Sequence, residues 1–208
     1  AIDLVLDRRT PTVLYAAMYE WDRNPWRLVL GGTGTGVYRS SDAGAKWQRL
    51  EGGLPSGTLG RTGLDLYQKN PNILYALVEN LNPRPEGVAR AADACTAGAP
   101  PAAGRAGGAG GRGGATSGPI GNEVYRSDDG GKTWRKTHSD GIDVGGGKAP
   151  YSFNQIKINP NNPDHIIINS DTMYVSTDGG KTWSCSNTNG FFRGVFGDFR
   201  TMWWDAED

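Results

Sequence analysis

Alternating apolar and polar residues recur along the chain in paired runs. Each pair flanks a short turn that contains Pro, and three such segments read IDLVLDRRTPTVLYAAMYE near the N-terminus, LDLYQKNPNILYALVEN from Leu64 and QIKINPNNPDHIIINSD from Gln155. A period of two predicts strands, because successive side chains of a strand point to opposite faces of a sheet. Each segment therefore predicts a β-hairpin.

An eight-residue phrase recurs downstream of these hairpins. It reads SSDAGAKW at Ser40–Trp47, SDDGGKTW at Ser127–Trp134 and STDGGKTW at Ser176–Trp183. Strand-like residues on both sides, such as VYRS before and TWRKT after the second copy, predict another hairpin with the phrase at its turn. The repeating unit is thus four strands.

The predicted strands group into three units, and no segment shows a persuasive helical period. The strands are about Ile2–Asp7, Thr12–Glu20, Gly36–Ser41 and Lys46–Glu51 in the first unit, Thr62–Tyr67, Asn72–Asn80, Glu123–Asp128 and Thr133–His138 in the second, and Phe153–Ile158, Asp164–Asn169, Thr172–Thr177 and Thr182–Asn187 in the third. Four-stranded units that repeat at roughly fifty residues are typical of β-propeller blades. We therefore predict an all-β fold, a β-propeller of four-stranded antiparallel blades with about three blades present.

The spacing of the phrases locates an insertion in the second unit. Trp134 and Trp183 are 49 residues apart, whereas Trp47 and Trp134 are 87 apart. The excess includes Thr96–Gly118, where 18 of 23 residues are Gly, Ala or Pro, too poor in apolar side chains to offset the entropy of ordering. We predict blade 1 at residues 1–61, blade 2 at 62–152 with the insertion at about 81–122, blade 3 at 153–199, and the start of a further blade at 200–208.

The side chains of the phrase suit a tight turn. Ser127 and Asp129 are expected to accept hydrogen bonds from N–H groups of their own turn, Gly131 to adopt a positive φ, and Trp134 to offer an apolar surface to the neighbouring sheet. This structural role is favoured over acid–base chemistry or calcium binding, for which the EF-hand spacing is missing. The structural positions of the three copies are Ser40, Asp42, Gly44 and Trp47; Ser127, Asp129, Gly131 and Trp134; and Ser176, Asp178, Gly180 and Trp183.

The pattern SxDxGxTW resembles the Asp-box, or bacterial neuraminidase (BNR) repeat. The match is specific in the second and third copies and degenerate in the first, where Ala45 and Lys46 precede the tryptophan. The chain is most similar to bacterial sortilin-like and glycosyl-hydrolase-type BNR-repeat β-propellers. The resemblance implies that the box lies at the turn between the third and fourth strands of a blade, away from the active face. It implies a fold more firmly than a function.

The predicted turns are short and regular on one face of the propeller, and the other face carries long loops. These loops run about Trp21–Thr35, Gly52–Arg61, Leu81–Asn122, Ser139–Ser152 and Thr188–Arg200. Binding residues concentrate on loops, and loop aromatics suit sugar stacking or protein contact; the alternative is that the aromatics fill gaps between blades. The candidate ligand-binding residues are Trp21, Asp22, Arg23, Trp26, Tyr151, Phe191, Phe192, Arg193 and Asp198.

Several kinds of site find no support in the sequence. The formal net charge is zero, which gives no strong pull toward nucleic acid or an anionic membrane, and no run of eighteen apolar residues predicts a membrane span. His138 and His165 fall in unrelated positions, so we expect no metal site, and we expect no cofactor. Cys95 and Cys185 have no CxxC spacing and form either a disulfide or two free thiols.

Two functions of different classes remain. The first is a non-catalytic extracellular β-propeller scaffold, secreted, periplasmic or at the cell surface, that binds a protein, peptide or glycan through its long-loop face or builds a larger assembly. The second is a glycoside hydrolase of the sialidase or xyloglucanase-like class. The FRIP motif of sialidases is absent, and no motif singles out the loop carboxylates Asp22, Asp143 and Asp198, so we favour binding.

The number of units also carries an expectation. Three blades do not close a propeller, which usually has four to eight, and RTMWWDAED at Arg200–Asp208 resembles the first strand of another blade. We therefore expect further blades or neighbouring chains to complete the propeller.

Overall fold

A computed structural model of the chain describes residues 1–89, 91–95, 118–145, 153–170, 172–185 and 201–205. The described residues form strands, turns and bends, with no helix long and apolar enough to cross a membrane. Nearly all of the predicted Gly/Ala-rich stretch, Thr96–Gly118, lies outside the described residues.

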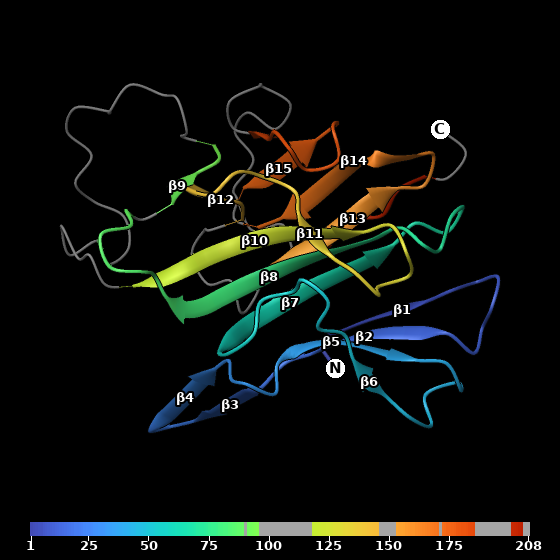
Figure 1. Cartoon of the computed structure of the whole chain (residues 1–208), viewed down its shortest axis with the longest axis horizontal. Helices are drawn as coiled ribbons and strands as arrows, with labels where there is room; N and C mark the ends of the chain where they lie inside the picture. Colours follow the sequence, from blue (N-terminus) through green and yellow to red (C-terminus); the bar gives the residue numbers. More distant parts are fainter. Residues whose placement is uncertain (90, 96–117, 146–152, 171, 186–200, 206–208) are drawn as a thin grey trace.

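Three four-stranded antiparallel sheets follow one another along the chain (Figure 1). Blade 1 contains β1 (Asp3–Leu6), β2 (Leu14–Met18), β5 (Gly36–Ser40) and β6 (Gln48–Arg49); blade 2 contains β7 (Leu59–Leu66), β8 (Leu74–Pro83), β10 (Pro119–Ser127) and β11 (Arg135–Lys136); blade 3 contains β13 (Gln155–Asn159), β14 (Asn162–Asn169), β15 (Met173–Ser176) and β16 (Ser184–Cys185). The predicted all-β fold of four-stranded blades is confirmed.

The fourth strand of each blade is shorter than predicted. The strands predicted at Lys46–Glu51 and Thr133–His138 contain only two ladder residues each, in β6 and β11. The amides of Lys46 and Thr133 instead donate hydrogen bonds of 2.8 and 2.9 Å to the carboxylates of Asp42 and Asp129 in the preceding turns. These two amides therefore bond within the turn, although the alternation of apolar and polar residues predicts that they belong to the strand.

Cross-strand partners align the three blades residue by residue. Equivalent triplets on the first three strands are Leu4, Ala16 and Tyr38 in blade 1, Leu64, Ala76 and Tyr125 in blade 2, and Ile156, Ile168 and Tyr174 in blade 3. In blades 2 and 3 these positions face the preceding blade, and we call the equivalent face of every blade its leading face.

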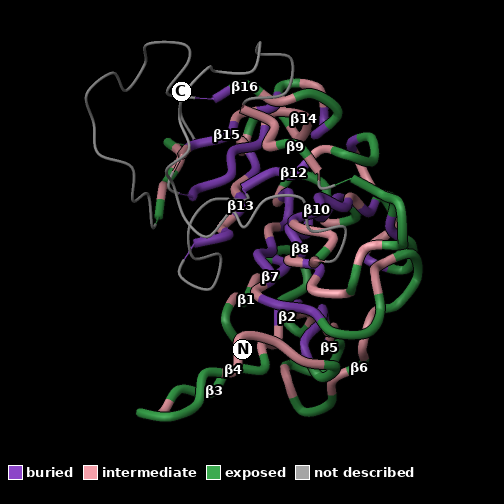
Figure 2. The backbone as a smooth tube through the Cα atoms, turned by 90° about the vertical axis from the view of Figure 1, so that its left-hand side faces the viewer, coloured by how far each residue is buried: buried purple, intermediate pink, exposed green. Residues whose placement is uncertain are grey.

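The first strands of consecutive blades lie side by side, β1 with β7 and β7 with β13. An aspartate links each pair, because Asp3 accepts a hydrogen bond of 3.1 Å from the amide of Leu64, and Asp65 accepts one of 2.8 Å from the amide of Ile158. Buried residues fill the two interfaces between blades, as the purple segments of Figure 2 show. The sheets therefore pack face to face in sequence order, the arrangement of propeller blades.

Successive side chains of β10 point to opposite faces of blade 2 and pack against both neighbouring blades. Tyr125 belongs to the apolar cluster against blade 1, together with Tyr15 and Leu64. Its neighbour Val124 belongs to the cluster against blade 3, together with Ile156. The inner strands β8 and β10 of the middle blade therefore bury side chains on both faces, whereas the edge strand β11 does not.

The short turns lie on one face of the molecule, as predicted. In blades 1 and 2 the eight-residue turn hydrogen-bonds to the turn between the first two strands, from Ala43 N to Thr12 O at 2.9 Å and from Gly130 N to Asn72 O at 3.0 Å. In blade 3 the corresponding bond runs from Gly179 N to Asp164 O, near the start of β14, at 2.9 Å. The same bonds show that Thr12, Asn72 and Asp164 occupy equivalent positions.

Two small elements on the other face were not predicted. The loop expected at Trp21–Thr35 contains an antiparallel hairpin of β3 (Trp21–Asn24) and β4 (Arg27–Leu30). A parallel pair joins β9 (Ala92–Asp93) to β12 (Ile142–Asp143). The hairpin was missed because aromatic and charged residues interrupt its alternation, and the parallel pair because its partners lie about fifty residues apart.

Residues 201–205 form no strand. Trp204 packs edge-on against His165 of β14, with the ring centroids 4.9 Å apart. The start of a further blade at 200–208 therefore stays a prediction.

Candidate functional site

The turn of blade 2 uses its serine and aspartate internally. Ser127 Oγ accepts hydrogen bonds from the amides of Asp129 and Gly131 at 3.3 and 2.9 Å, and it donates one of 2.8 Å to Asp129 Oδ1. The two carboxylate oxygens of Asp129 also bind the amide and hydroxyl of Thr133 at 2.9 and 2.6 Å. These bonds from Thr133 lower the pKa of Asp129 to about 2. The carboxylate is therefore a charged part of the turn and has no proton to exchange near neutral pH.

The two other turns repeat this pattern with one difference. Asp178 binds the amide and hydroxyl of Thr182 at 3.0 and 2.6 Å. In blade 1, Lys46 occupies the position of the threonine, so Asp42 accepts hydrogen bonds from the hydroxyl of Ser40 and the amide of Lys46 but lacks the threonine hydroxyl. The degenerate copy of the phrase therefore keeps the fold of the turn and loses one hydrogen bond.

A left-handed backbone and a tryptophan close each turn. Gly130 and Gly131 have φ values of +73° and +85°, whereas Ala43, which is equivalent to Gly130, adopts +58° with a side chain. Trp134 Nε1 donates a hydrogen bond of 3.0 Å to the carbonyl of Gly131. Sequence reasoning missed this bond and foresaw only the packing of the ring, although a buried indole N–H generally needs an acceptor.

The hairpin β3–β4 places four of the candidate ligand-binding residues together, namely Trp21, Asp22, Arg23 and Trp26. The ribbon projects from blade 1 on the face opposite the short turns (Figure 1). The side chain of Trp26 is 86% exposed and that of Trp21 is 55% exposed. Cross-strand pairing puts Arg23 opposite Leu28, so apolar and basic groups share one side of the ribbon.

The other five candidates lie outside the described residues. They are Tyr151, Phe191, Phe192, Arg193 and Asp198. The structure therefore neither joins them to the hairpin nor separates them from it.

A half-buried acid at the end of blade 2 escaped sequence reasoning. Glu79 on β8 accepts a hydrogen bond of 3.0 Å from the amide of Arg61. Burial raises the pKa of Glu79 to about 7, the bond from Arg61 lowers it, and the charge of Asp143 raises it further. A Cβ on Gly60 would lie only 2.2 Å from Glu79 Oε2, so the neighbouring glycine makes room for the carboxyl group. In the sequence, Glu79 precedes an asparagine near the end of a predicted strand, and nothing in that pattern indicates a raised pKa.

The family model for the BNR/Asp-box repeat matches residues 125–136 and 174–184. The chain carries BNR/Asp-box repeats. Both matches fall on the turns in which serine, aspartate and threonine form the network described above. Comparison of the sequence with curated proteins found no significant match.

Solved structures similar to the chain are large β-propeller proteins. They include the GH74 enzyme of Niastella koreensis (14% identity, TM-score 0.43, 88% of this chain and 22% of that one), the GH74 xyloglucanase of Xanthomonas campestris (13%, 0.44, 84% and 21%) and YCF48 bound to D1 peptide (16%, 0.41, 88% and 43%). The chain spans about a fifth of the length of the two GH74 proteins.

A disulfide joins Cys95 to Cys185, with the Cα atoms 5.5 Å apart. It decides between the two alternatives that the sequence left open. The bond connects the insertion of the second Asp-box blade to the last strand of the third. Cys95 follows the small β9–β12 pair, and Asp93 of that pair accepts a hydrogen bond of 2.8 Å from the hydroxyl of Tyr174.

The histidines have structural surroundings. His138 Nε2 accepts a hydrogen bond of 3.1 Å from the amide of Val124, and Nδ1 lies 3.1 Å from the carbonyl of Ser139. Burial lowers the pKa of His138, and accepting a bond at Nε2 requires the neutral ring. Within the described ranges, no three His, Cys, Asp or Glu side chains are grouped so as to hold a metal ion.

Proposed function

We propose that this chain is a non-catalytic binding scaffold, a set of β-propeller blades whose β3–β4 hairpin docks a protein, peptide or glycan. The observation that carries the proposal is the exposure of Trp21 and Trp26 on a ribbon that pairs with no third strand in the described part of the chain. Isolated two-stranded ribbons are marginally stable in water. A partner that covers the indole rings or extends the ribbon would supply the missing contacts.

Further blades form the second part of the proposal. Leu4 on the leading face of blade 1 is 58% exposed, whereas its equivalents Leu64 and Ile156 are fully buried against the preceding blade. Ile2 and Leu6 continue the same exposed row. An apolar face built like two buried ones supports another blade, from the same or a neighbouring chain, as its natural cover.

The disulfide supports an extracellular, periplasmic or cell-surface location. Disulfides persist in oxidising compartments and are rare in the cytosol. Cys95 and Cys185 are both engaged in the bond.

Glycoside hydrolysis is the second candidate, and Glu79 is the observation in its favour. A carboxylic acid with a pKa of about 7, near the carboxylate of Asp143, has the proton that a general acid needs. Against this role, Asp143 Oδ1 accepts a hydrogen bond of 3.0 Å from the amide of Asn122 and is buried. We therefore retain binding as the proposed function.

One pair of variants tests the docking surface. The 208-residue chain is applied to glycan and peptide arrays, and the spots that bind are compared with those of Trp26→Ala. We expect binding to fall at least tenfold while the melting temperature stays unchanged. Trp203→Ala removes another highly exposed tryptophan and should bind like the parent.

The competing outcomes are distinct. Equal binding by Trp26→Ala and the parent would remove the hairpin from the proposal. Turnover of aryl glycosides that disappears in Glu79→Gln or Asp22→Asn would replace scaffolding with catalysis. For the further blades, light scattering that reports a stable monomer at high concentration would contradict the need for a cover on Leu4.

A further inference from the structure

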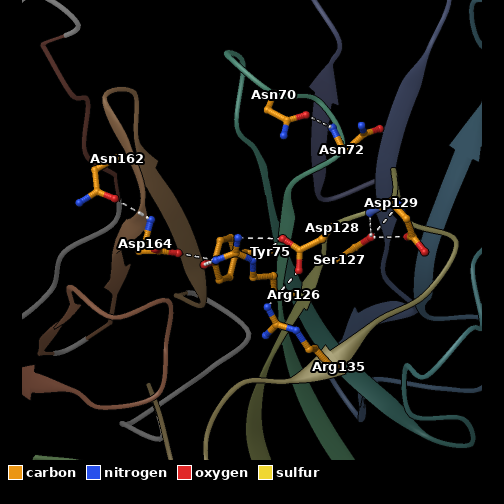
Figure 3. A network of polar contacts seen from close by, with 11 residues as sticks. Asn70, Asn72, Tyr75, Arg126, Ser127, Asp128, Asp129, Arg135, Asn162 and Asp164 are labelled. Atoms are coloured by element: carbon orange, nitrogen blue, oxygen red, sulfur yellow. Dashed lines mark hydrogen bonds and ion pairs between the residues drawn. The ribbon is translucent and has the colours of Figure 1, made fainter.

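An arginine between blades 2 and 3 is fully paired. Arg126 on β10 donates from Nε to Asp128 at 2.8 Å and from Nη1 to the hydroxyl of Tyr75 at 2.8 Å, and Nη1 also binds the carboxylate of Asp164 in blade 3. Figure 3 shows the guanidinium between Asp128 of its own blade and Asp164 of the next blade. Burial alone would lower the pKa of Arg126, but the two aspartates raise it.

Blade 1 has the same arginine and lacks both aspartates. Arg39 pairs across the sheet with Tyr15, as Arg126 pairs with Tyr75. The alignment of the phrases places Ser41 where blade 2 has Asp128. Asn72 occupies the position of Asp164, since each of these residues accepts the amide of its own Asp-box turn.

Among the described residues, no carboxylate forms an ion pair with the guanidinium of Arg39. It lies over the ring of Tyr15, 5.9 Å from the centroid. Its Nε is buried and has no hydrogen-bond acceptor in the part of the chain that the structure describes. A buried donor that loses water without gaining an acceptor is costly, most of all on a charged group.

Arg39 and Asn72 line a groove of about 800 Å³ between blade 1 and the Asp-box turn of blade 2. Three acids also line this groove, and each has a partner: the amide of Arg9 donates to Asp7 at 2.8 Å, Thr133 to Asp129 as above, and Arg49 Nε lies 3.7 Å from Glu51. The remaining basic residue of the groove is Lys132, which is exposed. The unsatisfied group in this groove is therefore a cation.

We propose that this groove binds an acidic peptide segment by placing an Asp or Glu carboxylate on Arg39. Both replacements remove a carboxylate acceptor and introduce a hydrogen-bond donor, because Ser41 and Asn72 can donate hydrogen bonds where Asp128 and Asp164 only accept them. A carboxylate at this place could accept hydrogen bonds from Arg39 and Asn72, which line the groove. In blade 2 the equivalent place is filled by the side chain of Asp164, near the start of β14, which is why the ligand is a peptide side chain.

This site is independent of the proposed function. It lies on the face of the short turns, whereas the hairpin of Trp21 and Trp26 lies on the opposite face. Failure of either proposal leaves the other unchanged.

The test follows the Nε–H resonance of Arg39 in the ¹⁵N-labelled chain, assigned through its loss in Arg39→Gln. The probe is a capped Gly-Asp-Gly-Asp-Gly peptide, and capped Gly-Asn-Gly-Asn-Gly is its neutral match. We expect the acidic peptide to shift the resonance with saturation and the neutral peptide to leave it unmoved. Arg126, whose Nε is already bound to Asp128, is the internal control and should not respond.

A double variant tests the chemistry with the arginine left in place. Ser41→Asp with Asn72→Asp copies the arrangement around Arg126, so the site should fill from within. We expect at least tenfold weaker peptide binding and a higher melting temperature, which also shows that the variant folds. Undiminished peptide binding in this variant, an equal response to the neutral peptide, or a response to inorganic phosphate alone would each overturn the proposal.

Discussion

The hydroxyl of Tyr15 on β2 donates a hydrogen bond of 3.0 Å to the carbonyl of Gly130, in the Asp-box turn of the next blade. The two residues are 115 positions apart in the sequence. The equivalent tyrosine of blade 2, Tyr75, accepts a bond from Arg126 instead. The Asp-box turn of blade 2 thus holds blade 1 in addition to closing its own hairpin.

Tyr15→Phe should weaken the contact between blades 1 and 2. The change leaves the ring in place and leaves a partly buried carbonyl without its donor, so the free energy of unfolding should fall by about 1 kcal/mol. Tyr38→Phe is the control, because its hydroxyl bonds to the carbonyl of Gly34 within the same blade at an exposed site. Urea unfolding measures both, and equal losses would show that the inter-blade bond has no special weight.

Ala43→Gly should stabilise the first Asp-box turn. Ala43 adopts a φ of +58°, where the two other boxes have Gly130 and Gly179. A Cβ in the left-handed region costs about 1 kcal/mol, offset in part by the freedom that glycine adds to the unfolded chain. We expect a small rise in the melting temperature, and Gly130→Ala should lower it. A fall in Ala43→Gly would mean that the turn relaxes without strain.

Removal of an Asp-box carboxylate should reduce stability. Asp178→Ala frees the amide and hydroxyl of Thr182 and should cost on the order of 1 kcal/mol, while the exposed Glu86→Ala should cost nothing measurable. Binding through the hairpin should be unaffected by Asp178→Ala. If a folded Asp178→Ala variant lost that binding, the Asp-box would be a functional site.

The Asp-box turns should also make the stability of the protein depend on pH below about pH 4. Hydrogen bonds from Thr133 hold the pKa of Asp129 at about 2, below its ordinary value of 3.8. The unfolded chain therefore takes up the proton first as the pH falls, and the stabilisation from Asp129 is complete above about pH 4 and lost toward pH 2. Unfolding curves of the parent and Asp129→Asn should converge over this range.

Glu79 should act in the opposite direction. Its pKa is about 7 in the folded chain and 4.5 as the ordinary value, so the folded state holds the proton longer and stability falls as the pH rises from 4.5 through 7. The loss is at most about 3.5 kcal/mol at 1.4 kcal/mol per pKa unit. Glu79→Gln keeps an acceptor for Arg61 and should remove this fall. Melting temperatures at pH 5 and pH 8 measure it, and an unchanged pH dependence would contradict the raised pKa.

Loss of the disulfide should be the most destabilising change. Cys95 and Cys185 are 90 residues apart, and releasing a loop of that length adds roughly 4 kcal/mol of conformational freedom to the unfolded chain by the entropic argument. The double variant Cys95→Ser, Cys185→Ser should therefore have a much lower melting temperature than the parent. Adding a reductant should lower the melting temperature of the parent and leave that of the variant unchanged. A parent that is insensitive to reductant would show that the bond is absent in solution.

The blades and their turns were predictable because they depend on local sequence. A period of two, a turn containing Pro and a repeated phrase each act over fewer than twenty residues, and local patterns of this kind specify hairpins. The alignment of the three phrases also identified the turn residues, including the serine and aspartate of each copy.

Tertiary structure decided the properties that depend on contacts between segments far apart in the sequence. The pKa of Glu79, the pairing of Cys95 with Cys185 and the missing anion at Arg39 follow from groups brought together from distant segments, and burial and charge at a site cannot be read from neighbours along the chain. Arg39 and Arg126 occupy the same position in two copies of one motif. Part of the difference is local, because Ser41 stands where blade 2 has Asp128. The neighbouring blade decides the rest, with Asn72 beside Arg39 and Asp164 paired with Arg126.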